Sequence, residues 1–132
     1  MTGAAPRPPD PALARRKREV EAEIFARRPE HAVEPTLDRI SALATLLGDP
    51  QRAYPVIHIT GTNGKTSTAR MIETLLRARG LRTGLFTSPH LSDIRERIVI
   101  DGEPLTLEAF LACYDDVARI SGRLATLGQG DA

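Results

Sequence analysis

The sequence predicts an α/β protein whose core is a parallel βαβ unit, with flanking helices, built around a phosphate-binding loop (P-loop). An apolar run at residues 56–59 leads into Gly61 and then into Gly64-Lys65-Thr66, where a helical pattern begins. A second apolar run follows that pattern at residues 83–87. Strand, helix and strand within about thirty residues are typical of a right-handed crossover between parallel strands. The glycine-flanked turn offers backbone N–H groups and a helix N-terminus, which together favour an anion.

Length and composition indicate one modest domain that binds a small molecule. A chain of 132 residues holds one core but not two full domains. Its formal net charge of +1 argues against a general nucleic-acid or membrane surface. Cys113 is the single cysteine, which excludes an intramolecular disulfide and a cysteine metal cluster. Because we find no membrane-spanning run and no signal peptide, we expect a soluble, cytoplasmic protein.

The chain is expected to begin with a disordered tail at residues 1–9, which hold Gly, Ala and Pro and have little to bury. Asp10 and Pro11 have the form of an N-cap and a first-turn proline for a helix over residues 11–27, and Pro29 ends it. One face of this helix carries Leu13, Val20, Ile24 and Arg27.

The basic run at residues 15–18 has two interpretations. It is either a phosphate-binding patch or a solvated helix face opposed by the acidic residues Glu19, Glu21 and Glu23. We favour the solvated face, because acidic partners at helical spacing satisfy the charges locally.

A second helix is expected to start near residues 35–36, to be capped by Gly48 and to stop at Pro50. Its apolar positions are read as core packing: Leu37, Ile40, Leu43 or Ala44, and Leu47. The strand at residues 56–59 is apolar on both faces, as in a buried parallel strand, so His58 is expected to be a hydrogen-bonded core histidine.

The helix after the loop is expected over residues 65–79, with Gly80 as its cap. Its apolar stripe consists of Ala69, Ile72, Leu75 and Leu76. The following strand, residues 83–87, ends at Ser88. Because the carboxyl ends of parallel strands open on one sheet edge, we expect Ser88 beside the phosphate loop.

The last part of the chain predicts a strand at residues 97–100, a turn at Asp101-Gly102 and a long helix capped by Thr106. The apolar stripe of that helix is Leu107, Phe110, Leu111, Tyr114, Val117, Leu124 and Leu127. Cys113 reads as a small apolar filler, and Asp115-Asp116 as a solvated face rather than metal ligands.

The phosphate loop matches only part of the Walker A pattern, because Ile59 stands where that pattern has its first glycine. The backbone N–H groups that would cradle phosphate oxygens are those of Thr62, Asn63, Gly64, Lys65, Thr66 and Ser67. Lys65 would reach the β and γ phosphates as the catalytic cation, and the Thr66 hydroxyl could ligate Mg²⁺. Ser67 could equally cap the helix or contact phosphate.

Four motifs together resemble the N-terminal part of folylpolyglutamate synthase/dihydrofolate synthase, a family of the Mur ligase superfamily. They are the loop segment at residues 57–67, Thr87-Ser88-Pro89-His90-Leu91, Glu96-Arg97-Ile98 and Asp101-Gly102-Glu103-Pro104. The resemblance runs from about residue 37 to residue 110. It implies a P-loop, Mur-ligase-like ATP-binding domain with ATP and Mg²⁺ as cofactors.

The activity implied by the resemblance is ATP-dependent ligation of L-glutamate to folate or dihydropteroate through an acyl phosphate. Carried over by motif, the residues from Gly64 to Ser67 form the ATP loop. Ser88 then ligates Mg²⁺, together with Thr66 or Ser67, of which we favour Thr66. Without the family, Ser88 would read as a turn residue.

Pro89, His90 and Arg97 correspond in the same way to a loop near the folate site. Read alone, His90 is a hydrogen-bonding turn residue rather than a ligand or base.

The family is much longer than this chain, so residues 10–132 are expected to be an N-terminal piece, inactive alone and monomeric when complete. The alternatives are a non-catalytic nucleotide-binding module and a peptidoglycan-type Mur ligase.

Overall fold

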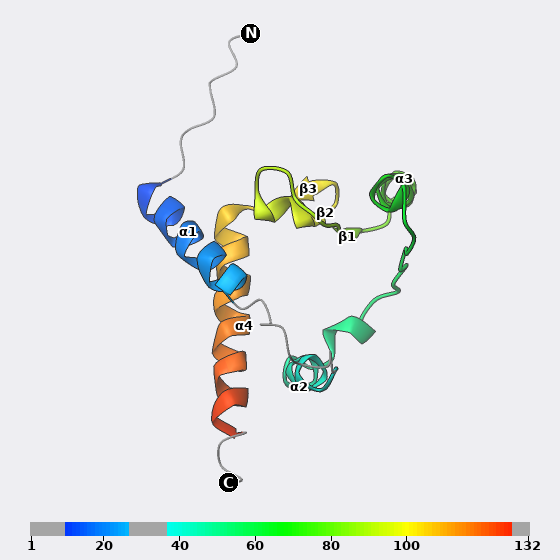
Figure 1. The fold of residues 1–132 in the computed structure, drawn as a ribbon. Coiled ribbons are helices and arrows are strands. Elements are labelled where there is room, and N and C mark those ends of the chain that lie inside the picture. The colour runs from blue at the N-terminus through cyan, green and yellow to red at the C-terminus, as the bar shows by residue number, and fades with distance from the viewer. Residues whose placement is uncertain (1–9, 27–36, 128–132) are drawn as a thin grey trace.

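The computed structural model describes residues 10–26 and 37–127, and the side chains of these residues up to 123 (Figure 1). The helices are α1 (Pro11–Ala26), α2 (Asp38–Leu46), α3 (Lys65–Ala78) and α4 (Leu107–Leu127), with 3₁₀ turns η1 (Pro50–Arg52) and η2 (Ile94–Arg97). The strands are β1 (Gly84–Phe86), β2 (Ile98–Ile100) and β3 (Glu103–Pro104). The expected tail, Arg27, Pro29 and the start of the second helix lie outside the described residues.

Two predicted helix caps are confirmed, at the starts of α1 and α4. The Asp10 carboxylate accepts the N–H of Ala12 at 2.8 Å, which caps α1 as predicted. Thr106 caps α4 by accepting the N–H of Ala109 at 3.2 Å.

Among the described helices, none combines the length and the apolar character needed to cross a membrane.

The sheet is a small antiparallel meander in the order β1-β2-β3. Leu85 of β1 faces Val99 of β2, and Ile100 faces Glu103 across the hairpin turn. Asp101 and Gly102 form that turn with φ values of 50° and 86°, the left-handed conformation that an Asp-Gly pair tolerates best. The turn prediction is therefore confirmed.

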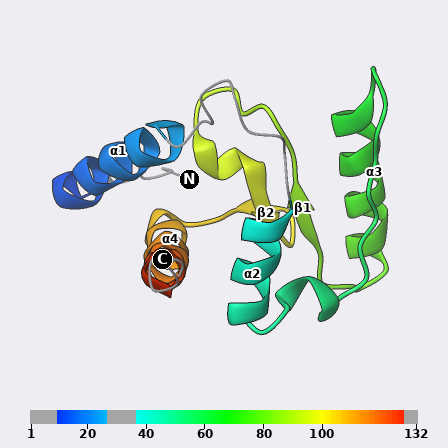
Figure 2. The same ribbon diagram turned by 60° about the horizontal axis from the view of Figure 1, so that its bottom comes forward.

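The prediction of a parallel βαβ core is wrong for the part of the chain that the structure describes. Residues 55–60 run as an extended connection up to α3 without joining a ladder (Figures 1 and 2). Val56 and Ile57 are 67% and 60% exposed, and His58 is exposed rather than a core histidine. An apolar run becomes a strand only where a partner supplies hydrogen bonds, and β1 finds its partner in β2.

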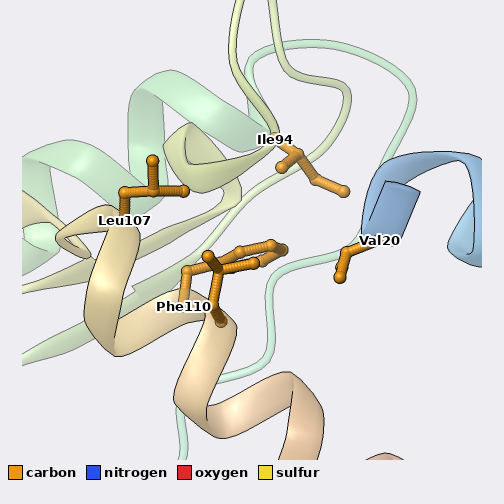
Figure 3. Packing of buried hydrophobic residues seen from close by; sticks show 5 residues of the cluster. Val20, Ile94, Leu107 and Phe110 are labelled. Atoms are coloured by element: carbon orange, nitrogen blue, oxygen red, sulfur yellow. The ribbon is translucent and has the colours of Figure 1, made fainter. Parts of the chain in front are cut away.

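The hydrophobic core lies where α1 crosses the start of α4 beneath η2 (Figure 3). Val20 of α1 is 0% exposed, and it packs with Ile94 of η2 and with three residues of α4: Leu107, Phe110 and Leu111. Leu13 and Ile24 lie against this cluster, which confirms the predicted apolar face of α1.

Two smaller packing predictions are wrong. Leu37 and Ile40 of the second helix are 75% and 57% exposed, so α2 does not bury the face that its pattern offers. Cys113 of α4 is exposed instead of filling the core.

Phe110→Ala is expected to lower the free energy of unfolding by about 3–5 kcal/mol, because it leaves a cavity in the centre of a small core. That is a large part of the 5–15 kcal/mol typical of a domain. Urea unfolding followed by circular dichroism measures the change. Val117→Ala on the same helix is the control, since Val117 is 39% exposed and should cost less than about 1 kcal/mol. Equal losses for the two variants would contradict this account of the core.

Candidate nucleotide and metal site

The phosphate loop is shaped by two glycines with positive φ. Gly61 has φ 145° and Gly64, the N-cap of α3, has φ 74°. A Cβ atom at either position would meet nothing within 4 Å, so glycine is required there by backbone conformation and not by lack of space. The loop is exposed along residues 60–68, which leaves its surface open to a ligand.

The N-terminus of α3 has free hydrogen-bond donors. The first helical bond runs from the Thr68 N–H to the Gly64 carbonyl at 2.9 Å, and no side chain caps the helix. The preceding N–H groups of the first turn, those of Lys65, Thr66 and Ser67, therefore have no intrahelical partner. Such groups, with the positive end of the helix dipole behind them, suit a phosphate.

Lys65 brings a cation to the same loop. Its Nζ donates to the carbonyl oxygen of Gly61, so the side chain bends back across the turn instead of extending into solvent. The ammonium group and the free N–H groups of α3 thus lie on one short segment. This donor set fits the oxygens of a nucleotide phosphate.

The second group of predicted site residues follows β1. The Ser88-Pro89 peptide is cis, and Ser88 and Pro89 are exposed. Arg97 Nε donates to His90 Nδ1 at 2.8 Å. Because a guanidinium N–H can only donate, Nδ1 is the acceptor and the neutral ring carries its proton on Nε2.

Arg97 also fastens the strand end, because its carbonyl oxygen accepts the Thr87 N–H at 3.1 Å. The His90 ring lies 6.3 Å from the ring of Phe25 at the end of α1, tilted by 41°. The structure therefore brings His90 and Arg97 together, as expected, and adds Phe25. Phe25 was not predicted as a site residue, because the sequence shows only its position in a helix and not its proximity to His90.

Glu96 organises the loop that carries His90. Its carboxylate accepts the N–H groups of Leu91, Ser92 and Asp93 at 2.9, 3.1 and 2.9 Å, and the Ser92 hydroxyl at 2.6 Å. These hydrogen bonds lower the pKa of Glu96 to about 2, and the bond from the Ser92 hydroxyl has the largest effect. Asp93 completes a capping box by accepting the Arg95 N–H at 2.9 Å. This arrangement was not predicted, although the Asp-x-x-Glu spacing of a capping box could have indicated it.

Replacing Glu96 by glutamine is expected to make stability less dependent on pH. The pKa of Glu96 falls from 4.5 to about 2 on folding, so its contribution is full above pH 4.5 and disappears as the pH falls towards 2. The difference in unfolding free energy between wild type and Glu96→Gln should therefore shrink between pH 6 and pH 3. Urea titrations at the two pH values measure it. A difference that stays constant would contradict the assignment.

The basic run of α1 is only in part the solvated face that the sequence favours. Lys17 pairs with Glu21 at 3.3 Å, as expected, but also reaches Asp93 at 3.0 Å. Arg16 reaches Asp115 of α4 at 2.8 Å. These ion pairs hold α1 against the η2 turn and α4. They also show why Asp115 is not a free surface charge.

The phosphate loop and the Ser88 loop lie on the same side of the fold. In Figure 2 the amino end of α3 and the chain leaving β1 both point towards the upper side of the view. Among the hydrogen bonds of the described residues, none joins Thr66 or Ser67 to Ser88. The two groups therefore lie on the same side of the fold, and no hydrogen bond among the described residues joins these hydroxyls.

Within the described part of the chain, no group of three or more His, Cys, Asp or Glu side chains could hold a metal. The residues predicted to ligate Mg²⁺, Ser88 with Thr66 or Ser67, would offer hydroxyl oxygens. This suits Mg²⁺, which keeps several waters and takes one or two protein ligands beside phosphate oxygens.

Comparison with known proteins gives one consistent group of relatives. A family model described as the Mur ligase middle domain matches residues 59–109. The dihydrofolate synthase/folylpolyglutamate synthase of Mycobacterium tuberculosis is 45% identical over 131 residues, which are 99% of this chain and 26% of that protein.

Solved structures agree with the sequence match. A Mycobacterium tuberculosis folylpolyglutamate synthase complexed with ADP and AMPPCP superposes with a TM-score of 0.79 at 44% identity, over 89% of this chain and 25% of that one. A folylpolyglutamate synthase complex with AMPPCP and folate gives a TM-score of 0.79 at 37% identity, over 88% of this chain and 28% of that one. The chain thus spans about a quarter of the length of these proteins. Over that quarter, it is similar to folylpolyglutamate synthases and dihydrofolate synthases in both sequence and structure.

Proposed function

We propose that this chain supplies the ATP-binding part of a ligase that adds L-glutamate to folates, as a tetrahydrofolylpolyglutamate synthase, a dihydrofolate synthase or both. The observation that carries the proposal is the pairing of a phosphate loop with the ordered Ser88–His90 loop on one face of the fold. The relatives support it, because their names specify folylpolyglutamate or dihydrofolate synthesis and their structures hold ADP, AMPPCP or folate.

The phosphate loop takes the triphosphate. The backbone N–H groups of residues 62–67 surround the phosphate oxygens, and Lys65 neutralises charge on the β and γ phosphates. Thr66 and Ser88 are the residues that would hold Mg²⁺, with Ser67 as the alternative to Thr66. When bound, Mg²⁺ would supply charge neutralisation between the phosphates.

The Ser88–His90 loop serves the folate side. Arg97 fixes the His90 ring so that Nε2–H is available as a donor, and Phe25 provides an aromatic surface next to it. Pro89 lies between Ser88 and His90, which places an apolar ring beside both. Such a combination of aromatic surface and a few fixed donors suits a flat heterocycle such as a pterin.

The reaction proceeds in two balanced steps. A carboxylate oxygen of the folate attacks the γ phosphorus of ATP, the bond to the β–γ bridging oxygen breaks, and ADP leaves with that electron pair. The glutamate amine then attacks the acyl carbon, loses a proton, and inorganic phosphate leaves as the amide forms. The protein contributes mainly position and charge to the first step.

The test is a glutamate-addition assay on the complete gene product. Radiolabelled L-glutamate, ATP and Mg²⁺ are supplied with dihydropteroate or with tetrahydrofolate, and we expect labelled folate product with one ADP formed per bond. The 132-residue chain alone is expected to bind nucleotide weakly without turnover. Absence of ATP-dependent product from either substrate would overturn the ligase assignment, and nucleotide binding without product would identify a non-catalytic module instead.

A further inference from the structure

Glu73 is the only buried charged side chain among the described residues, with 8% of it exposed. It lies on α3, the helix that begins at Lys65. Its carboxylate accepts the Thr83 hydroxyl at 2.7 Å and Arg77 Nε at 2.9 Å. The Thr83 hydrogen bond is the largest cause that lowers the pKa of Glu73, which keeps the carboxylate ionised.

Thr83 is itself fixed on its other side. Its N–H donates to Asp101 Oδ1 at 2.8 Å, and its carbonyl oxygen accepts the Asp101 N–H at 2.9 Å. The guanidinium of Arg77 lies on Gly102, where an added Cβ atom would come within 2.7 Å of Arg77 Cζ. The Glu73–Thr83 bond is therefore part of a tight junction between α3, the base of β1 and the hairpin turn.

We propose that Glu73 and Thr83 are positioning residues that set where the phosphate loop stands relative to Ser88. The proposal rests on the function proposed above. Two segments, here called the arms of the site, run from this bond to the predicted site residues. The first arm is α3 from Glu73 back to Lys65, eight residues or about 12 Å along the helix. The second arm is the chain from Thr83 to Ser88, five residues or about 16 Å along an extended chain.

The junction matters because little else ties the two arms together. In the part of the chain that the structure describes, residues 55–60 form no ladder that would fix the loop from its other end. A hydroxyl on α3 and a hydroxyl after β1 can share one Mg²⁺ only if helix and strand keep their relative position. A change in the angle between α3 and β1 at Glu73 and Thr83 would displace the hydroxyls of Thr66 and Ser88 relative to each other. A misplacement of about 1 Å at a reacting centre lowers the reaction rate by about 100-fold.

The test uses Thr83→Val, which keeps the side-chain shape but removes the hydroxyl. In the complete gene product, calorimetry measures ATP affinity in EDTA and the Mg²⁺ concentration that half-saturates the Mg²⁺-dependent gain in affinity. We expect ATP affinity in EDTA to stay within about twofold, since the loop is intact. The half-saturating Mg²⁺ concentration should rise on the order of tenfold, as for other residues that orient metal ligands.

Two further variants separate positioning from a general loss of stability. Glu73→Gln keeps an oxygen that accepts the Thr83 hydroxyl, so its half-saturating Mg²⁺ concentration should stay near that of wild type even if its melting temperature falls. Thr45→Val, at an exposed threonine on α2, should change neither quantity.

An unchanged half-saturating Mg²⁺ concentration in Thr83→Val would overturn the proposal, as would an equal loss of ATP affinity with and without Mg²⁺. These readouts measure binding and not turnover. A failed glutamate-addition assay would therefore reject the ligase function without deciding whether Glu73 and Thr83 position the metal ligands.

Discussion

Lys65→Ala is expected to abolish ATP binding that calorimetry can detect. Lys65 supplies the cation of the phosphate loop, and its ammonium already lies over the turn, on the Gly61 carbonyl. Hydrogen bonds to charged groups are worth about 1.5–3 kcal/mol each, so losing two of them weakens binding by a factor on the order of 100 to 10,000. In the complete enzyme the loss should be larger in the chemical step, where charge moves onto the phosphate oxygens.

The matched control is Lys17→Ala, the removal of the only other lysine. Lys17 pairs with Glu21 and Asp93, on the α1 side of the fold, so this variant changes the net charge equally and leaves the loop intact. Circular dichroism should show a native spectrum for Lys65→Ala, because the residue is exposed and its removal leaves no cavity. Full ATP affinity in Lys65→Ala would show that residues 61–67 are an ordinary turn into a helix.

The features that the sequence predicts well are those decided within a few residues. The Asp10 cap, the Asp101-Gly102 turn and the start of α3 at Lys65 each depend on local backbone chemistry, and each is found where it was expected. The same holds for the core face of α1, because residues at helical spacing must share a side. Val20 is fully buried on that side.

Strand pairing was not predictable in this way. An apolar run such as residues 56–59 indicates that a segment suits burial, but it does not identify a partner. Val56 stays 67% exposed, while β1 pairs with β2 in the antiparallel sense. Pairing depends on contacts between segments that are distant in sequence, and periodicity carries no information about them.

The candidate site divides along the same line. The phosphate loop could be found from its own residues, but the partners of His90 could not, because Phe25 lies 65 residues away and Arg97 was known only as part of a motif. Nothing in the sequence around Glu73 distinguishes it from an acidic residue on a helix surface. Its burial follows from Thr83, which only the packing of α3 on the base of β1 brings near.

Ser88→Ala is expected to reduce the turnover number for glutamate addition by at least on the order of 100-fold, with ATP affinity in EDTA unchanged. Replacing residues that merely support a metal ligand lowers metal affinity or activity by about 10–100-fold, and loss of a direct ligand should lower it by no less. Among the described residues, the hydrogen bonds of this loop run to Glu96 and Arg97 and none uses the Ser88 hydroxyl. Steady-state kinetics of the complete gene product at several Mg²⁺ concentrations measure the effect.

Ser92→Ala is the control within the same loop. It removes the 2.6 Å hydrogen bond to Glu96, so it should lower the melting temperature, but it removes no proposed metal ligand and should leave the Mg²⁺ dependence as in wild type. Ser88→Ala should show the opposite pattern, with a native melting temperature and a raised Mg²⁺ requirement. If both serine variants lost stability and neither changed the Mg²⁺ dependence, Ser88 would be a turn residue, and the metal would have to rest on the phosphate-loop hydroxyls of Thr66 and Ser67 alone.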